Sequence, residues 1–331
     1  MEDQPGNRNF VYATNAKGVS AINMCRLVGV SYKTAFILMH KLREAIMVSV
    51  DASLLIGEVH VDGGHVGGKV RKANKKADRQ KRQQRDRIPD VVSQFHPNRR
   101  ITMVARSVEK GSGAVRTVVS QVTQETASNV LPFVKRTVKH GARIHTDELS
   151  AYTALGAVYD HHTVNHSEEF QTDNGVNNNQ AESFFTRHKR MIIGQLHRMT
   201  PKYMCDYAHE TAWREDTRRN TDRRLVERLL EVALRSGTSV FWRGYHQGHH
   251  RQDEIVFPTT VEDAIEITKV HAEEHTNQQA VMNELKRTDL AAWEQWKTQK
   301  YFGDLIADLR AGKTPRRRAP KLTLRSPVWD G

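Results

Sequence analysis

The sequence predicts an α/β fold in which helices flank a mixed sheet, with a helical pair before it and a helical extension after it. Three observations favour this class. Apolar runs of strand length occur within 91–106 and 115–122, a helix-like run follows at 126–139, and a further strand at 142–145 ends next to an acid. Strands that alternate with helices are typical of α/β sheets. Because ligands of such sheets bind where the strands end, polar residues at those ends are candidates for a functional site.

The predicted helical pair lies at residues 17–47. Two runs with apolar residues at helical spacing are separated by Gly29, and Ser31 is a suitable N-cap for the second run. Helix, glycine turn and helix is the helix-turn-helix pattern, whose second helix meets base edges with its N-terminal residues. An ordinary helical hairpin is the alternative. On the DNA-binding hypothesis, the contacting side chains are those of Tyr32, Lys33 and Thr34.

The composition points to a polyanionic partner. The 331 residues carry a formal net charge of +13 at pH 7, and a charge of this size favours binding to nucleic acid. No apolar run approaches the roughly 20 residues that span a bilayer, and the first residues do not resemble a signal peptide, so we expect a cytoplasmic protein without membrane contact. The two cysteines form no CxxC pair, and the 17 histidines are scattered without an HExxH motif. We therefore expect most of the histidines to be surface or DNA-facing and no zinc site.

The stretch EVHVDGGHVGGK at 58–69 is the first candidate site. Its valines alternate with polar residues, which is the period of a half-buried strand. The two glycines after Asp62 are expected to end the strand, and a second glycine pair allows a tight turn. An acid at the open end of a strand can bind a metal and admit a large substrate. An Asp-Gly hairpin turn is the alternative.

A basic tract follows this stretch, at 69–87. It begins with Lys69 and holds ten Lys or Arg residues against two acids, without apolar periodicity. A solvated loop is the simple interpretation. Beside Asp62, however, such a loop would be able to neutralise phosphates near the site.

Two further acids occupy comparable positions. Asp147 follows the strand at 142–145, and Glu182 lies early in a helix expected at 179–193, 35 residues after Asp147. The spacing of Asn179 and Glu182 also fits a capping box, with Asn179 as the N-cap. Lys189 lies seven residues beyond Glu182 and therefore shares its helix face. A second long helix is expected at about 201–236.

Three such acids suit the hydrolysis of a phosphodiester bond. That reaction is assisted by two metal ions roughly 3.5–4 Å apart, and Mg²⁺ prefers carboxylates, waters and substrate oxygens as ligands. Two acids on strands and a third on a helix would hold such a pair of ions against a DNA phosphate. The basic helix face that follows Glu182 would then contact the DNA.

These segments together resemble prokaryotic insertion-sequence transposases of the DDE superfamily, in particular the group with the ISXO-type transposase domain. The resemblance covers roughly residues 17–220, and the order and spacing of its motifs carry it. The motifs are VHVDGGHVGGK from Val59, HTDELSAY from His145, NNNQAESFFTRHKRMIIGQLHRM from Asn177 and YAHETAWREDTRR from Tyr207.

The resemblance implies a ribonuclease-H-like core and two Mg²⁺ or Mn²⁺ ions held by Asp62, Asp147 and Glu182. The third ligand in this group can be Asn or Glu; Asn179 is the possible alternative, and we favour Glu182 because a carboxylate is the better Mg²⁺ ligand. The expected partners are the terminal inverted repeats of the element, target DNA and a second copy of the chain in a synaptic complex. We expect a nucleoid-associated prokaryotic protein. Beyond the helical pair, DNA contacts are expected at Lys189, Arg190, His197 and Lys69.

The sequence departs from the group's pattern in two ways. Members usually carry Glu directly after the first Asp, where this chain has Gly63. They also commonly carry a zinc ribbon before the helix-turn-helix, for which this sequence has no cysteines. A truncated copy and a misassigned start are the two explanations for the missing ribbon.

We therefore expect three regions: a helix-turn-helix DNA-binding region at 1–50, a catalytic domain at 51–235 with a basic loop at 69–90, and a helical extension at 236–331 with a basic tail. The predicted function is a DNA transposase that cuts element ends and joins them to target DNA. The alternatives are a non-transposing nuclease or resolvase on the same fold, and a decayed DNA-binding remnant without catalysis.

Overall fold

The computed structural model describes residues 6–67, 99–164, 178–197 and 199–288. The chain divides into two compact units, Met1–Lys269 and Val270–Gly331. Helix α10 (Val261–Thr288) begins in the first unit and ends in the second. The boundaries expected after residues 50 and 235 remain predictions. None of the described helices combines the length and the apolar character needed to cross a bilayer.

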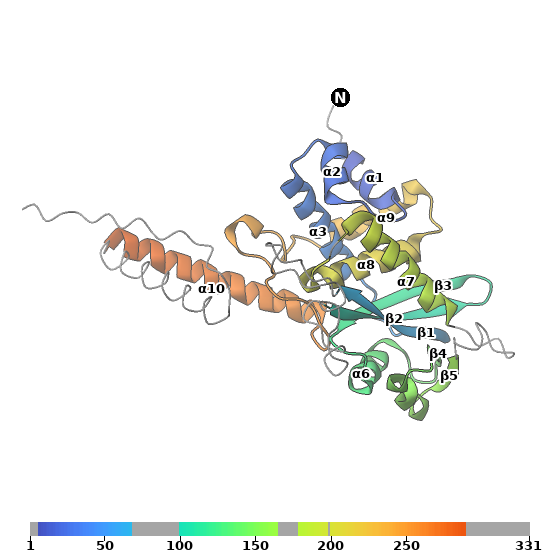
Figure 1. Cartoon of the computed structure of the whole chain (residues 1–331). Helices are drawn as coiled ribbons and strands as arrows, with labels where there is room; N and C mark the ends of the chain where they lie inside the picture. Colours follow the sequence, from blue (N-terminus) through green and yellow to red (C-terminus); the bar gives the residue numbers. More distant parts are fainter. Residues whose placement is uncertain (1–5, 68–98, 165–177, 198, 289–331) are drawn as a thin grey trace, which may run out of the picture. The chain divides into compact units, whose positions relative to one another are not determined.

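A five-stranded mixed sheet forms the centre of the first unit (Figure 1). Neighbouring strands follow the order β3-β2-β1-β4-β5; β1, β2 and β3 pair antiparallel, whereas β4 pairs parallel with both β1 and β5. This is the arrangement of a ribonuclease-H-like core, and the predicted α/β class is confirmed. The strands are β1 (Glu58–Gly67), β2 (Arg99–Glu109), β3 (Gly113–Val122), β4 (Arg143–Asp147) and β5 (Asp160–Val164).

Helices cover both faces of the sheet, because alternate side chains of each strand point to opposite faces. On one face, Val59 and Val61 pack in a core with Phe133 of α6 (Ala127–Thr137) and the short helix η2 (Ser150–Ala157). On the other face, Val104 packs with Phe184. The helices of that second face are α7 (Asn179–Met191) and α8 (Pro201–Thr217).

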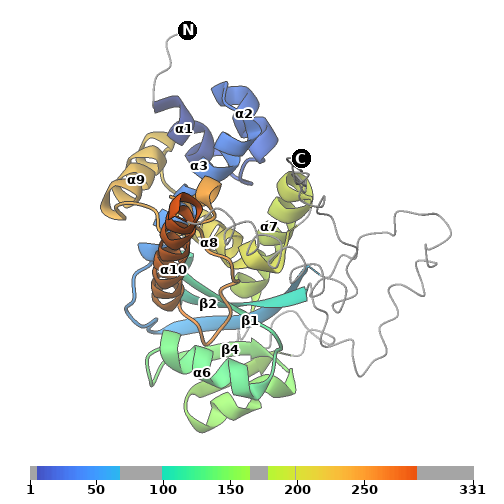
Figure 2. The same ribbon diagram turned by 90° about the vertical axis from the view of Figure 1, so that its left-hand side faces the viewer.

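The N-terminal residues form a helical unit that packs against α9 (Asp222–Arg235), as Figure 2 shows. The two helices expected within 17–47 are present, and Gly29 between them has the left-handed φ of 69° that glycine favours. The hydroxyl of Ser31 accepts a hydrogen bond from the Thr34 amide and caps the second helix, as predicted. An additional first helix was not predicted. The helices are α1 (Gly6–Thr14), α2 (Ala21–Val28) and α3 (Tyr32–Val48).

Buried charged groups join the N-terminal unit to α8. Arg43 Nε of α3 donates to Glu210 Oε2 at 2.6 Å, and Glu210 Oε1 accepts from Arg214 Nη2 at 2.7 Å. Burial by itself raises the pKa of Glu210, but the two guanidinium groups lower it to about 2. Asp206 bonds in the same way to Arg251, at 2.6 Å, and to His40, at 3.4 Å. Because every one of these side chains is buried, the N-terminal unit and α8 are held as one body.

Two expected element boundaries are wrong. Strand β1 does not end after Asp62, because residues 62–67 continue to pair with β2 as far as Arg99. The single helix expected at 201–236 is two helices, because the chain leaves α8 after Thr217 and Thr221 caps α9 by accepting from the Arg224 amide. A five-residue π-turn, η3 (Ile192–Leu196), also extends α7.

Some predictions lie outside the described residues. These are the basic loop at 69–90 with Lys69, the strand segment at 91–92 and the basic tail at 313–321. Within the extension expected to be helical from residue 236, the described residues 237–258 contain one helical turn, η4 (Tyr245–Gln247).

Candidate metal-binding active site

Asp62 and Asp147 lie on adjacent parallel strands. His60 of β1 is the register partner of His145 of β4, so the two aspartates, each two residues further along, stand at the same level. The Gly63 amide donates to Asp62 Oδ1 at 2.8 Å, and the Leu149 amide donates to Asp147 Oδ1 at 3.2 Å. Backbone donors therefore orient both carboxylates.

The close approach of α7 to β1 brings in the third acid. A Cβ atom on Gly64 would lie 2.3 Å from the ring of Phe185, so α7 can pack at this distance only because residue 64 lacks a side chain. Glu182 precedes Phe185 by one helical turn and is exposed, whereas Phe185 is buried. The two glycines after Asp62 are thus packing residues in a strand, and the hairpin-turn alternative is wrong.

Three other acids lie near enough to Asp62 for their charges to act on it, although the donor atoms of these acids do not gather within 4.8 Å of one another as a group of three. Burial raises the pKa of Asp62 to about 8, and the charges of Asp147, Glu125 and Glu182 act in the same direction, against the hydrogen bond from Gly63. Carboxylates that repel one another in this way are the donor set that a hard divalent cation prefers. The residues present therefore fit Mg²⁺ or Mn²⁺.

Glu125 is a member of this group that the sequence did not reveal. It lies between β3 and α6, and its Oε1 is 2.2 Å from the position that a Cβ on Gly63 would take. The hydroxyl of Tyr152 donates to the same Oε1 at 2.5 Å. Because the carboxylate fills the space beside residue 63, a side chain at this position would collide with it. This contact gives a steric reason for glycine at residue 63, where the family that the sequence resembles usually has Glu.

Asn178, also missed, anchors the start of α7 to β1. Its side chain is buried, and Nδ2 donates to the carbonyl of Val61 at 3.3 Å. Asn178 is the N-cap residue, and no side-chain capping bond forms. The expected N-cap, Asn179, is instead the first residue of the helix and is exposed, so the capping-box interpretation is wrong.

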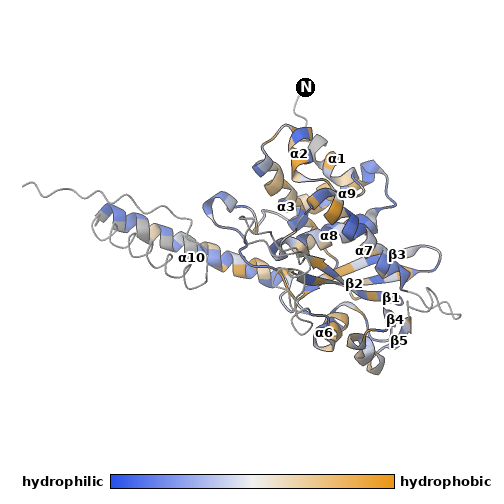
Figure 3. Cartoon of the chain, viewed as in Figure 1, coloured by the Kyte–Doolittle hydropathy of each residue, from blue (hydrophilic) through white to orange (hydrophobic). Residues whose placement is uncertain are grey.

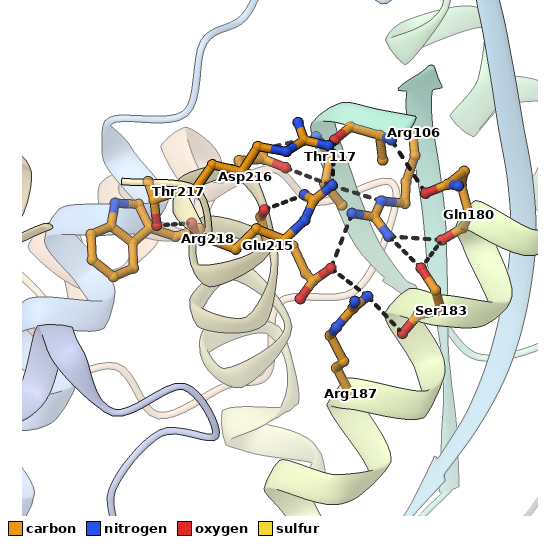
Figure 4. Close-up of polar contacts among 12 residues, drawn as sticks. Arg106, Thr117, Gln180, Ser183, Arg187, Glu215, Asp216, Thr217 and Arg218 are labelled. Atoms are coloured by element: carbon orange, nitrogen blue, oxygen red, sulfur yellow. Dashed lines mark hydrogen bonds and ion pairs between the residues drawn. The ribbon is translucent and has the colours of Figure 1, made fainter. Parts of the chain in front are cut away.

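A buried arginine fixes the first turn of α7 (Figure 4). Arg106 Nη1 on β2 donates to the Gln180 carbonyl at 2.7 Å and to Ser183 Oγ at 3.1 Å, and so contacts α7 on both sides of Glu182 in sequence. Its Nη2 bonds to Glu215 Oε2 of α8 at 3.2 Å, and Arg187 bonds to the same oxygen at 2.8 Å. This network ties α7 to the sheet and to α8.

The expected DNA contacts on and after α7 are exposed where the structure describes them. Lys189 and Arg190 are exposed on α7, and Figure 3 shows hydrophilic residues along much of this helix. His197 follows η3, is exposed and has a left-handed φ of 55°.

The expected base-reading residues lie elsewhere, on the N-terminal helical unit. Tyr32, Lys33 and Thr34 are exposed in the first turn of α3. Lys33 Nζ lies 5.8 Å from the ring centroid of Tyr245. These side chains do not lie next to the carboxylates. They belong to the N-terminal helical unit, which buried ion pairs join to α8.

Most of the histidines were expected to face the surface or DNA, and five of the 17 are buried. Two belong to a second group of donor atoms: Glu58, His60 and His145 offer one atom each, all within 4.8 Å of one another. The rings of His60 and His145 are 5.0 Å apart with planes at 12°. The five are His40, His60, His145, His188 and His209.

The part of the chain that carries the carboxylates matches a known family. Residues 54–216 match the family model described as ISXO2-like transposase domain. A comparison with curated proteins gave no match. The match begins just before β1 and ends in the last turn of α8, so it includes all four acids of the group: Asp62, Glu125, Asp147 and Glu182.

Proposed function

Through residues 54–216 the chain belongs to the ISXO2-like transposases of the DDE superfamily, and from this premise we propose that it cuts the ends of an insertion sequence and joins them to target DNA. Hydrolysis adds water across a P–O3′ bond and leaves a 3′-OH and a 5′-phosphate. Strand transfer then lets that 3′-OH attack a target phosphodiester, so one phosphodiester bond forms as another breaks.

The convergence of Asp62, Asp147 and Glu182 from three separate elements carries this proposal. The charges of the other two act on the half-buried Asp62 carboxylate, and the family is one whose chemistry needs a divalent cation at carboxylates. Two Mg²⁺ or Mn²⁺ ions, when bound by these three residues, would activate the attacking water or 3′-OH and stabilise the leaving oxygen.

The chain's own residues hold the carboxylates and the DNA in place. Arg106 and the glycine at residue 64 keep α7 against β1, so that Glu182 faces the strand acids. Lys189 is two turns further along the same helix and would bind a backbone phosphate near the site. Arg190 and His197 extend this exposed face.

Recognition of the element ends is assigned to the first turn of α3. The exposed Tyr32, Lys33 and Thr34 occupy the positions from which a recognition helix contacts base edges. Pairing of two DNA ends would require two copies of the chain, as in a synaptic complex.

The test is a cleavage and joining assay with the full-length protein, Mg²⁺ and linear DNA that carries the sequences flanking the gene. We expect new 3′-OH ends and joined products. Asp147→Asn should abolish both and keep DNA binding, because the amide is a poorer metal ligand. Glu148→Gln removes the same charge from the adjacent exposed residue and should behave like the parent protein.

Each other outcome has a defined meaning. Cleavage by Asp147→Asn at the parental rate would show that the site is assigned wrongly. Cleavage without joined products would support the nuclease or resolvase alternative. DNA binding without metal-dependent cleavage would support a decayed remnant, and binding that is insensitive to salt would exclude the nucleic-acid function.

A further inference from the structure

The carboxylate of Glu125 lies directly against the backbone of the residue that follows Asp62. An ideal Cβ on Gly63 would lie 2.2 Å from Glu125 Oε1, 2.5 Å from Cδ and 2.8 Å from Oε2. All three distances are below the closest approach of real atoms, so any L side chain at residue 63 would displace the carboxylate. Glycine at this position therefore admits an acid from a different part of the chain.

A buried tyrosine holds this carboxylate. The Tyr152 residue is fully buried in the core under the sheet, and its hydroxyl donates to Glu125 Oε1 at 2.5 Å. The hydrogen bonds of Glu125 with described residues engage this one oxygen, which leaves Oε2 for another ligand. The side chain is thus oriented in advance of any binding event.

The charges around Glu125 oppose a purely structural role. The carboxylates of Glu125 and Asp147 both act on Asp62 in the direction that disfavours its ionised form, and Asp147 acts in the same way on Glu125. A residue whose sole task was to accept the Tyr152 hydrogen bond would do so equally well as a neutral amide. A negative charge that is partly buried beside two others is costly without a cation.

We propose that Glu125 is a fourth carboxylate of the metal site, that it ligates the divalent cation together with Asp62 and Asp147, and that Gly63 and Tyr152 exist to position it. This inference rests on the proposed function, since the cation is the one that transposase chemistry requires.

The first test measures Mn²⁺ binding to the full-length protein by isothermal titration calorimetry and electron paramagnetic resonance. Glu125→Gln keeps an oxygen for the Tyr152 hydroxyl and removes the charge. We expect its Mn²⁺ affinity to fall by about tenfold or more. Glu148→Gln, the matched control at an exposed acid, should bind like the parent protein. Parental Mn²⁺ affinity in Glu125→Gln would overturn the proposal.

Thermal unfolding provides a readout independent of activity. If Glu125 is a metal ligand, Glu125→Gln relieves repulsion, so without metal the melting temperature should stay the same or rise, while the increase caused by Mn²⁺ should shrink. If the residue only supports the fold, the melting temperature without metal should fall and the Mn²⁺-induced increase should be unchanged. The second pattern contradicts the proposal.

A second variant changes no ligand atom. Gly63→Ala would push the Glu125 carboxylate away from the strand, so its Mn²⁺ affinity should also fall, and truncation in the double variant Gly63→Ala/Glu125→Ala should weaken binding little further. If the losses of Mn²⁺ affinity in Gly63→Ala and in a Glu125 variant multiply in the double variant, residue 63 does not act through Glu125, which counts against the proposal. Should any variant fail to fold, Fe²⁺-dependent hydroxyl-radical cleavage of the parent protein still decides: cuts near residue 125 as well as near 62 and 147 are expected, and their absence near 125 would overturn the proposal.

The failure of this inference can be distinguished from failure of the proposed function. If Asp62→Asn loses Mn²⁺ binding and Glu125→Gln does not, the transposase site stands and only Glu125 is removed from it. If the parent protein binds no Mn²⁺ and cleaves no DNA, both proposals fall together.

Discussion

Two groups of buried or half-buried charged side chains differ in how their charges are balanced. Around α8, Glu210 lies between two arginines and Asp206 lies between Arg251 and His40. In the middle of β1, Asp62 is acted on by three other carboxylates. The pKa of Glu210 is accordingly lowered, to about 2, whereas that of Asp62 is raised, to about 8.

On the proposed function, the difference separates charged groups that hold the fold together from charged groups that would bind a cation. Opposite charges in a buried cluster satisfy one another, so the cluster is complete within the chain. Like charges in one place destabilise the metal-free protein and are compensated only when a cation arrives. Carboxylate-to-amide substitutions should therefore have opposite effects on stability in the two regions.

The largest effect is expected in the balanced group. Glu210→Gln leaves the buried guanidinium groups of Arg43 and Arg214 without their counter-charge, so the free energy of unfolding should fall by about 3–5 kcal/mol. Urea denaturation measures it. Glu227→Gln on α9 breaks exposed ion pairs and should leave the midpoint unchanged. Equal effects of the two substitutions would remove the distinction between buried and surface pairs.

The next largest effect is expected when the pH is lowered, because two buried histidines then reduce the free energy of unfolding. Burial lowers the pKa of His40, in the balanced group, and of His188, on α7, each to about 4. Between about pH 6.5 and 4 the unfolded chain binds protons that the folded chain does not. The free energy of unfolding should therefore decrease by about 1.4 kcal/mol for each histidine and each pH unit by which the pH is lowered. Denaturation at pH 7 and 5 tests this. His188→Gln should reduce the difference, and an unchanged pH dependence would contradict the assignment.

A smaller effect of opposite sign is expected at the carboxylate group. With metal removed by chelator at pH 7, Asp62→Asn should raise the free energy of unfolding by on the order of 1 kcal/mol, because the neighbouring acids and burial keep the folded Asp62 carboxyl protonated, and the amide removes the cost of that proton uptake on folding. The same variant should lose the stabilisation that Mg²⁺ gives to the parent protein. A metal-free Asp62→Asn protein that is less stable than the parent would mean that the acids are not in conflict.

The smallest effect concerns the network between the two groups. Ser183→Ala removes one of the acceptors of Arg106 Nη1 and leaves the Gln180 carbonyl in place. Stability should fall by about 0.5–1.5 kcal/mol. Thr186→Ala, at an exposed position of the same helix, is the matched control. A larger loss in the control would show that helix propensity, and not the arginine contact, dominates.

Local patterns in the sequence were enough for part of the site. Asp147 is the last residue of the short strand β4, and Glu182 lies in the first turn of the amphipathic helix α7, so both elements were predictable from local patterns in the sequence. The same local rules misassigned Gly63 and Gly64, because glycine favours turns when its neighbours are unknown. Pairing with β2 across ten residues overrides that preference, and the lack of side chains serves packing on both faces of the strand.

The rest depends on contacts between distant segments. Glu125 stands before a helix like many capping residues, and only its position beside Gly63 identifies it. Arg43 and Arg106 would be expected at the surface from their charge alone, yet both are buried because acids on α8 meet them. Periodicity carries no information about such partners, which lie more than 100 residues away in the sequence.

The docking of α3 onto α8 has a consequence for how the protein would measure DNA. On the proposed function, α3 recognises a DNA sequence and the sheet holds the cleaved phosphate, and Arg43–Glu210 and His40–Asp206 in the interior would keep these two sites at a fixed separation. Inserting one base pair between the recognised sequence and the cut moves the phosphate by about 3.4 Å along the duplex. The length of that interval is therefore a property of the protein, and the cut should stay at a constant distance from the recognised bases when the intervening DNA is lengthened.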